Sequence, residues 1–473
     1  MMLKSWERMA LALATALLFL CLPARAAAAQ PIQDQQQQKQ PYTLPEYNAL
    51  QAARAEKDPQ QGIKMLDAFV AQYPNSTLMP YVYQQYIADY SALKDYAKVM
   101  EYADKTVALG DKADAAIPGL RLTALDTRVR AFYSWYTPQN AKAPEANDQL
   151  TKARDAALLG AKLMESFPKP ANTSEEAFAE TKKKEMAFFD AAAAYADVQL
   201  KDDSGAIAQY KAAITADQSD TSVAAWEYQI GLAQLALTPP QTLDGFWSLA
   251  RAIDLKMPQA DQVKEFLHAR ILAYEQPGCV SQVDAQLNEM LQLAANSPDR
   301  PATYTIPSQD DLSKIRNASN ILTIIADLSG GGDKAKMTWL AVCGSELPEV
   351  VGKIIDVQKS DNYVDFMVFT AATPQDMQAG TTANMDVKVW TANPPAAAAP
   401  ASGATGAAAP AQNVAQPDVL RLQKDDGIKF SGTLVSYDPS PFLLHWDQVK
   451  VDPSVIPAAK PAARRPARKT THR

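Results

Sequence analysis

Few residues in this sequence have the type and spacing that catalysis requires. The run Gly330-Gly331-Gly332-Asp333-Lys334 superficially resembles a phosphate-binding loop. A P-loop, however, needs G-x-x-x-x-G-K-[ST] between a strand and a helix, and here a helical pattern precedes the glycines. The sequence also contains no G-x-S-x-G elbow and no H-E-x-x-H motif. We therefore expect a helix end at these glycines, and the sequence predicts no enzyme activity.

Carboxylates and histidines likewise form no pattern that indicates a reaction or a metal site. The paired acids fall at predicted helix starts, turns or strand edges, where such pairs usually cap helices or interact with water. These pairs are Asp202-Asp203, Asp310-Asp311 and Asp425-Asp426. The three histidines, His268, His445 and His472, are scattered along the chain and lack metal-ligand spacing. We predict no metal ion and no cofactor.

The first 29 residues have the pattern of a secretory signal peptide. Lys4 and Arg8 precede an apolar run, Met9–Leu22, that is too short to span a bilayer comfortably. Pro23 ends this run, and the small residues at 24–29 offer cleavage sites of the A-x-A type. An uncleaved anchor helix is the alternative. No later segment is long and apolar enough to cross a membrane, so we expect a soluble periplasmic or secreted protein.

Two cysteines remain after the predicted cleavage, Cys279 and Cys343. Two cysteines in an exported protein can form a disulfide bond. Cys279 begins one helix-like segment and Cys343 ends another, so a bond would tie the end of the helical region to the domain that follows. Two separate buried thiols are the alternative, and the sequence does not decide between them.

Aromatic residues on predicted helices are the stronger functional signal. Tyr83, Tyr86 and Tyr90 share one face of a helix, and Trp226 and Trp247 lie on later helices. One interpretation is packing between helices. The other is a concave surface that stacks on an extended peptide, because tyrosine combines apolar area with a hydroxyl group. These five residues are the candidate partner-contact residues.

The elements that carry these residues are helices with a repeated pattern, from residue 42 to residue 295. The segments 79–112 and 187–220 each contain an apolar helix, a short polar turn and a second helix with small or apolar residues on one face. Both segments resemble tetratricopeptide repeats, and Ile230-Gly231 occupies positions where such a repeat usually has an apolar residue and a glycine. The other units are stretched by insertions and lack the consensus tryptophan and tyrosine positions.

The resemblance implies an α-solenoid that binds protein or peptide segments in its groove. Binding would use apolar and tyrosine contacts together with side-chain hydrogen bonds, without covalent chemistry. An ordinary helical bundle is the simplest alternative for the same helices.

Residues 296–347 are a predicted helical linker, in which a helix starts at Asp310-Asp311 and continues through Leu328. The region that follows alternates apolar and polar residues with a period of two. Five runs rich in β-branched and aromatic residues predict short strands there. These runs are 350–360, 362–371, 385–390, 428–438 and 442–451. Five short strands suggest a barrel or a sandwich. With Gly352 in the first strand and Gly432 in the fourth, residues 348–457 resemble an OB-type antiparallel barrel. The predicted fold class is therefore α+β with two domains.

An OB-type barrel often binds oligonucleotides or oligosaccharides through aromatic residues. Tyr363, Phe366 and Trp446 could serve this purpose, and Trp390 lies at a strand end. The net charge of −7 argues against nucleic acid as the main ligand. An exposed Trp390 or Trp446 would favour a carbohydrate site, whereas burial of both in the core would disfavour it.

Three segments should be disordered because their composition provides no core. They are the glutamine-rich 30–41, the Pro/Ala loop 392–417 and the basic tail 458–473. The tail could contact an anionic membrane surface, or it could simply be solvated.

These patterns together predict an exported scaffold or adaptor of a bacterial-type cell envelope that binds protein or peptide partners. The alternative is an envelope protein that binds carbohydrate or another polymer through the barrel. The sequence predicts neither the partner nor the oligomeric state.

Overall fold

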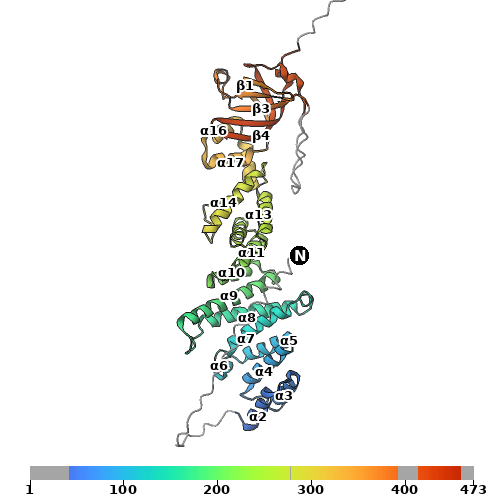
Figure 1. The fold of residues 1–473 in the computed structure, drawn as a ribbon, viewed down its shortest axis with the longest axis vertical. Helices are drawn as coiled ribbons and strands as arrows, with labels where there is room; N and C mark the ends of the chain where they lie inside the picture. Colours follow the sequence, from blue (N-terminus) through green and yellow to red (C-terminus); the bar gives the residue numbers. More distant parts are fainter. Residues whose placement is uncertain (1–41, 277, 393–413, 460–473) are drawn as a thin grey trace, which may run out of the picture. The chain divides into compact units, whose positions relative to one another are not determined.

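The computed structural model describes residues 42–276, 278–392 and 414–459, and the chain divides into two compact units, 1–257 and 258–473 (Figure 1). The predicted signal peptide at 1–29 and glutamine-rich segment at 30–41 lie outside the described residues. So do residues 393–413 of the Pro/Ala loop predicted at 392–417 and residues 460–473 of the basic tail predicted at 458–473.

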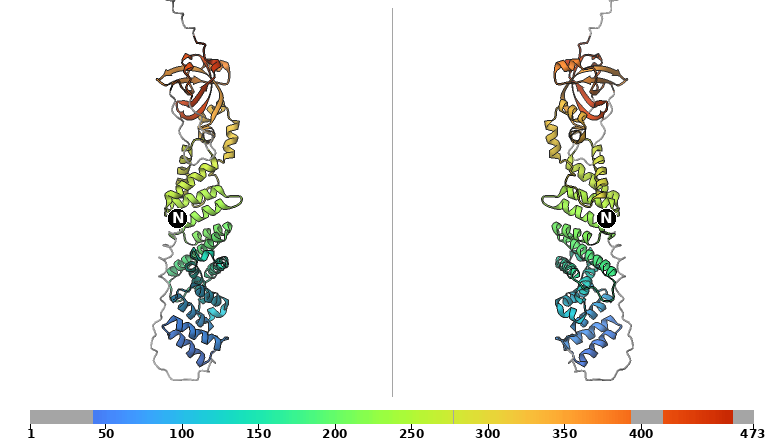
Figure 2. Two further views of the ribbon diagram at one scale, coloured as in Figure 1. Left: turned by 90° about the vertical axis from the view of Figure 1, so that its right-hand side faces the viewer. Right: turned by 90° about the vertical axis from the view of Figure 1, so that its left-hand side faces the viewer.

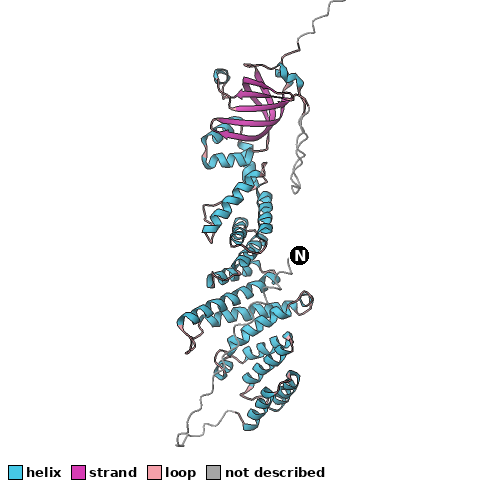
Figure 3. Cartoon of the chain, in the orientation of Figure 1, coloured by secondary structure: helices cyan, strands magenta, loops and turns pink. Residues whose placement is uncertain are grey.

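The described part of the N-terminal unit consists of helices joined by short turns (Figure 3). The α-helices are α2 (Leu44–Ala55), α3 (Pro59–Gln72), α4 (Met79–Ala92), α5 (Tyr96–Ala108), α6 (Asp111–Ala116), α7 (Leu120–Trp135), α8 (Ala146–Glu165), α9 (Glu175–Leu200), α10 (Asp203–Ala216), α11 (Val223–Ala236) and α12 (Thr242–Asp254). A short 3-10 helix, η2 (Asn140–Lys142), precedes α8.

Side-chain caps fix where several of these helices begin. The Asp95 carboxylate accepts a hydrogen bond from the Lys98 backbone N–H at the start of α5, at 3.2 Å. The Asp202 carboxylate accepts one from the Gly205 N–H at the start of α10, at 2.9 Å. Such caps satisfy N–H groups that have no partner within the helix. The predicted capping role of the Asp202-Asp203 pair is therefore confirmed.

Consecutive helices of this unit pack against one another, and the two views of Figure 2 show them side by side along the chain. Tight pairs form between α4 and α5, between α9 and α10, and between α11 and α12. A cluster of buried alanines, Tyr210, Trp226 and Ile230 fills the space between α9, α10 and α11. The helical array predicted from the sequence is thus confirmed, whereas its assignment to tetratricopeptide repeats stays a prediction.

Glycines allow α11 and α12 to cross closely. A β-carbon on Gly231 would lie 2.9 Å from the Gly245 carbonyl oxygen, and one on Gly245 would lie 3.1 Å from the Gly231 carbonyl oxygen. Neither backbone atom can move aside as a flexible side chain could. The small residue at Gly231, which the sequence places at a repeat position, is therefore required by packing.

The C-terminal unit begins with five further helices. They are α13 (Ala260–Glu275), α14 (Ser281–Asn296), α15 (Gln309–Ala318), α16 (Ile321–Gly330) and α17 (Gly332–Val342). The solenoid predicted at 42–295 therefore spans the division between the units, because α13 and α14 belong to the second one. The helix end predicted at Gly330-Gly331-Gly332 is confirmed, and Gly331 and Gly332 have φ angles of 69° and 71°.

The segment predicted as a helical linker at 296–347 is part of the core of this unit. Residues of α15, α16 and α17 share one hydrophobic cluster with the strands, and the rings of Trp339 and Tyr437 meet with 5.0 Å between centroids. Apolar residues of α16 and α17 such as Leu328 and Trp339 are buried here, because leaving them exposed would cost about 2 kcal/mol each.

The five predicted strands are confirmed, and they close into a barrel in the order β1-β2-β3-β5-β4. Their bounds are β1 (Glu346–Lys359), β2 (Tyr363–Phe369), β3 (Met385–Trp390), β4 (Gly427–Pro439) and β5 (Phe442–Val451). The described residues between strands add helix α18 (Pro374–Ala379) and the 3-10 helix η3 (Pro417–Arg421), and η4 (Pro453–Val455) follows β5. Side chains alternate between the buried interior and the outer face along β2 and β3.

The expectation of a fully antiparallel barrel is wrong at one pair. β3 and β5 run parallel, with Asp386 opposite His445, while the other four neighbouring pairs are antiparallel. The reason is parity: strand directions cannot alternate all the way round a closed ring of five. One parallel pair is the minimum that such a ring permits.

A disulfide bond joins Cys279 to Cys343, with 5.6 Å between the two Cα atoms. Cys279 lies between α13 and α14, and Cys343 follows α17. The bond therefore connects two segments of the C-terminal unit, the start of the α14 segment and the junction that leads into β1.

Candidate functional site

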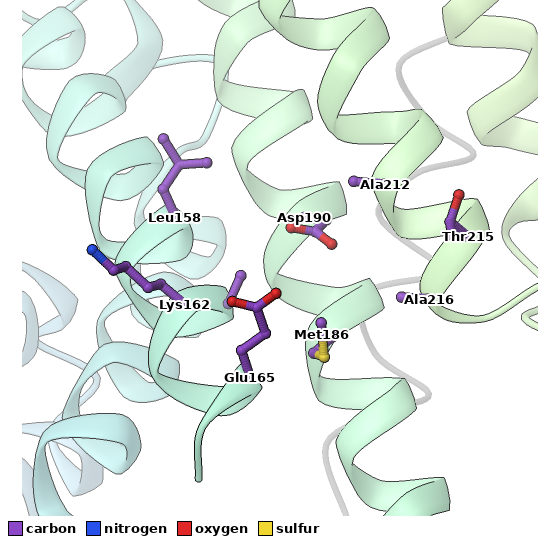
Figure 4. Close-up of a pocket in the computed structure, with 9 residues that line it drawn as sticks. Leu158, Lys162, Glu165, Met186, Asp190, Ala212, Thr215 and Ala216 are labelled. Carbon is purple, nitrogen blue, oxygen red and sulfur yellow. The ribbon is translucent and has the colours of Figure 1, made fainter.

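A groove on the N-terminal unit is the candidate site. It lies on α8, α9 and α10 and has a volume of about 620 Å³ (Figure 4). Residues three or four positions apart on each helix face it, as helical periodicity requires. They are Leu158, Ala161, Lys162 and Glu165 of α8, Met186 and Asp190 of α9, and Ala212, Thr215 and Ala216 of α10.

Small side chains keep this groove open while the helices remain close-packed. Gly160 lets α8 approach α9, because a β-carbon there would lie only 2.5 Å from the Phe189 ring. Alanines 161, 212 and 216 line the groove on its two outer helices and fill little of its space. Asp190 and Met186 project from the middle helix between them (Figure 4). The result is an apolar channel with one carboxylate at its floor.

Asp190 is the unusual group in this groove. Its exposed fraction is only 8 %, and no described residue donates a hydrogen bond to its carboxylate or forms an ion pair with it. Burial, reinforced by the nearby Glu165 carboxylate, raises the pKa of Asp190 to about 6. An ionised carboxylate that is partly removed from water without a partner costs free energy. A group kept at such a cost beside a cavity is a candidate for binding.

The three predicted contact tyrosines of α4 converge on Tyr102 of α5, which the sequence argument missed. Tyr86 stacks on Tyr102 with 4.1 Å between ring centroids, and its hydroxyl donates a 2.6 Å hydrogen bond to Asp67. Tyr83 and Tyr90 also lie within 6 Å of the Tyr102 ring, and both are half-buried. Tyr86 is 1 % exposed, so it packs in the core, and burial raises its pKa.

The two predicted contact tryptophans are core residues. Trp226 is 8 % exposed and Trp247 is 2 % exposed. Their indole rings fill space between helices, so neither presents a surface that a partner could reach in this conformation. Partner contact stays a prediction for all five candidate residues, of which Tyr83 and Tyr90 are the two that are only partly buried.

The candidate aromatic residues of the barrel also fall into a buried group and a partly exposed group. Phe366 and Trp446 point into the interior and are 0 % and 2 % exposed. Tyr363 and Trp390 lie on the outer face of β2 and β3, with their rings in edge contact at 5.4 Å. The Trp390 indole N–H donates a 3.3 Å hydrogen bond to Asp447 of β5. Of these four aromatic residues, only Tyr363 and Trp390 are exposed enough to contact a ligand.

His445 forms a bridge on the same outer face. Its ring nitrogens lie 3.0 Å from carboxylate oxygens of Asp386 and of Asp438. Burial alone would lower the pKa of His445, but the hydrogen bonds to the two carboxylates outweigh it and raise the pKa. This arrangement links β3, β5 and β4 through charge pairs. Nowhere in the described part of the chain do three or more acidic, histidine or cysteine side chains form a group that could hold a metal ion.

Comparison with known proteins adds no assignment to this geometry. No protein-family model matches the sequence, and no curated protein is significantly similar to it. Within the described residues, no helix has both the length and the apolar composition needed to cross a membrane.

Proposed function

We propose that this protein is a non-catalytic adaptor of an exported compartment, periplasmic or extracellular, and that it binds protein or peptide segments in the α8–α10 groove. The observation that supports this most is the unpartnered Asp190 at the floor of an apolar channel. Channels of a few hundred Å³ with a few polar groups are the usual form of a binding site. The signal-peptide pattern supports the location, and the helical array supplies the rigid frame.

A photo-crosslinking residue in place of Leu158 tests this function directly. Leu158 lies at the groove and is 37 % exposed, and Leu255 of the same unit is equally exposed but does not line the groove. We expect p-benzoylphenylalanine at position 158, in cells of the source organism, to form a discrete protein adduct that position 255 does not form. Ala212→Arg should reduce that adduct about tenfold, because a long cationic side chain would occupy the channel. Equal adducts at both positions would refute the groove as the binding surface.

The half-exposed Tyr363–Trp390 pair favours carbohydrate binding by the barrel as a second candidate. Aromatic rings on this face, flanked by Lys388 and Asp365, offer a stacking surface with polar groups around it. If the barrel binds glycans, Trp390→Ala should weaken binding to a glycan array about tenfold or more. Phe442→Ala, at another half-buried aromatic of the barrel, should leave it unchanged. Equal signals for both variants would count against this candidate.

A further inference from the structure

Acidic residues outnumber basic residues in the lining of the groove, and this excess indicates the charge of its ligand. Asp190 lies at the floor and Glu165 at the rim, whereas Lys162 is the only cation among the lining residues. The Lys162 amino group is directed away from Asp190 (Figure 4). The lining residues of α10 are uncharged. The lining residues therefore carry two acids and one base, and beside them the Lys182 amino group of α9 donates a 2.5 Å hydrogen bond to the Glu165 backbone carbonyl and not to Asp190.

We propose that the α8–α10 groove is a receptor for a lysine or arginine side chain presented by a peptide segment, with the cation paired to Asp190. The aliphatic part of that side chain packs against Met186 and the groove alanines, as long cationic side chains commonly do on apolar surfaces. This inference rests on the proposed function and names the chemistry that its ligand must have.

The energetic argument favours a cation over other ligands. A cationic group supplies the charge-assisted hydrogen bonds that the Asp190 carboxylate lacks, and such bonds are about twice as strong as neutral ones. A phosphate or carboxylate ligand would meet two like charges, Asp190 and Glu165, and would be repelled. A bare metal ion such as Ca²⁺ requires six to eight oxygen ligands, which two carboxylates do not provide.

The size of the groove favours a peptide over a free amine. About 620 Å³ is more space than one lysine or arginine side chain occupies. Flanking residues of the ligand would therefore lie over Ala161, Ala212 and Ala216, where small or apolar side chains fit best. The expected ligand is a segment with one basic residue between small or apolar neighbours.

Binding should weaken on acidification, since the cation needs an ionised Asp190. The charged groups around this carboxylate are Lys162 and Glu165 of α8 and Lys182 of α9, whose amino group lies on the Glu165 backbone carbonyl; the lining residues of α10 contribute none. With the pKa of Asp190 at about 6, roughly one tenth of the free protein is ionised there at about pH 5. The affinity should fall about tenfold between about pH 7.5 and pH 5.

Selection of random peptides displayed on phage against the full chain tests the inference. We expect enriched sequences to share one lysine or arginine, and the dissociation constant of a synthetic copy to rise at least about tenfold with Asp190→Asn. Glu176→Gln is the matched control, because it removes the same charge from an exposed position near the start of α9, about 21 Å along the helix. Replacing the peptide's basic residue by norleucine should weaken binding to the wild-type protein by the same factor. The norleucine peptide should then bind equally well to the wild type and to Asp190→Asn.

The possible outcomes separate this inference from the function on which it rests. Selected peptides that lose binding with Ala212→Arg but carry no basic residue would overturn the cation receptor and leave the adaptor groove standing. Basic peptides that bind equally to wild type and Asp190→Asn would also overturn it. If Ala212→Arg weakens none of the selected peptides, the groove is not a binding site, and both proposals fail. Circular dichroism and melting curves establish that each variant is folded.

Discussion

Replacing both Cys279 and Cys343 with alanine should destabilise the C-terminal unit by about 4 kcal/mol. The disulfide spans a sequence separation of 64 residues. Removing it restores conformational freedom to the unfolded chain, and the chain-entropy relation for a loop of this length gives this magnitude. Urea unfolding, followed by the fluorescence of Trp339 and Trp446 in this unit, measures the change.

Reduction of the wild-type protein is the control for this prediction. The reduced wild type and the double variant should unfold at similar urea concentrations, since both lack the bond. Cys343→Ser should lower the free energy of unfolding more than Cys279→Ser, although both variants lose the disulfide. Cys343 is 1 % exposed within the core, so its replacement buries a hydroxyl group, whereas Cys279 is only partly buried. A reduced wild type that is as stable as the oxidised one would contradict the predicted stabilisation.

The strands and the glycine-marked helix ends could be predicted because each depends on local chemistry. A period of two in residues 362–371 and 385–390 reflects one buried and one outer face, and the barrel provides both. The parallel β3–β5 pair could not be read from any single strand. It follows from closing five strands into a ring, which is a property of the whole barrel.

One helix boundary shows how a single side chain overrides an apolar pattern. The sequence predicts a continuous helix from Asp310 to Leu328, but the structure ends α15 at Ala318 and begins α16 at Ile321. The Asn320 side chain accepts hydrogen bonds from the backbone N–H groups of Leu322 and Thr323, both at 3.0 Å. Asparagine competes for backbone groups in this way and favours helix starts over helix interiors.

The aromatic candidates show the limit of periodicity for predicting a site. Spacing placed Tyr83, Tyr86 and Tyr90 on one face, but it could not say whether another helix covers that face. Tyr102 of α5 does so for Tyr86. The groove residue Asp190 carried a signal that was missed, namely an acid inside the alanine-rich, apolar run 186–200, seven residues before Asp197.

Two buried acids of α9, Asp190 and Asp197, should make the stability of the N-terminal unit depend on pH. Burial raises the pKa of Asp190 and of Asp197 to about 6, with Glu165 adding to the first shift and Asp202 to the second. The ion pair of Asp197 with Arg154, at 3.7 Å, opposes the shift without cancelling it. Both acids bind protons more tightly in the folded chain than in the unfolded chain, where their pKa is near 4. The protonated forms of the two acids therefore favour the folded state at low pH, and this contribution to the free energy of unfolding is lost as the pH rises from about 4 through about 6.

We accordingly expect Asp190→Asn combined with Asp197→Asn to stabilise the N-terminal unit by about 2 kcal/mol at pH 7 and by little at about pH 4, after allowance for screening by solvent. Thermal unfolding between about pH 4 and pH 8 measures this difference, and Glu175→Gln combined with Glu176→Gln, two exposed acids at the start of α9, controls for the change of two charges. Asp217 has the opposite effect on stability. Burial raises its pKa, but its hydrogen bonds with Lys183 and Ser219 outweigh burial and lower the pKa. The stability that Asp217 contributes is therefore lost only as the pH falls below about 4.

The same substitution separates a structural role of Asp190 from a binding role. If the carboxylate served the fold, Asp190→Asn would lower stability and weaken binding together. A gain in stability with a loss of peptide affinity would instead show that the fold retains a destabilising charge for its ligand, as binding sites commonly do. A gain in stability with unchanged affinity would mean that this carboxylate contributes nothing to recognition.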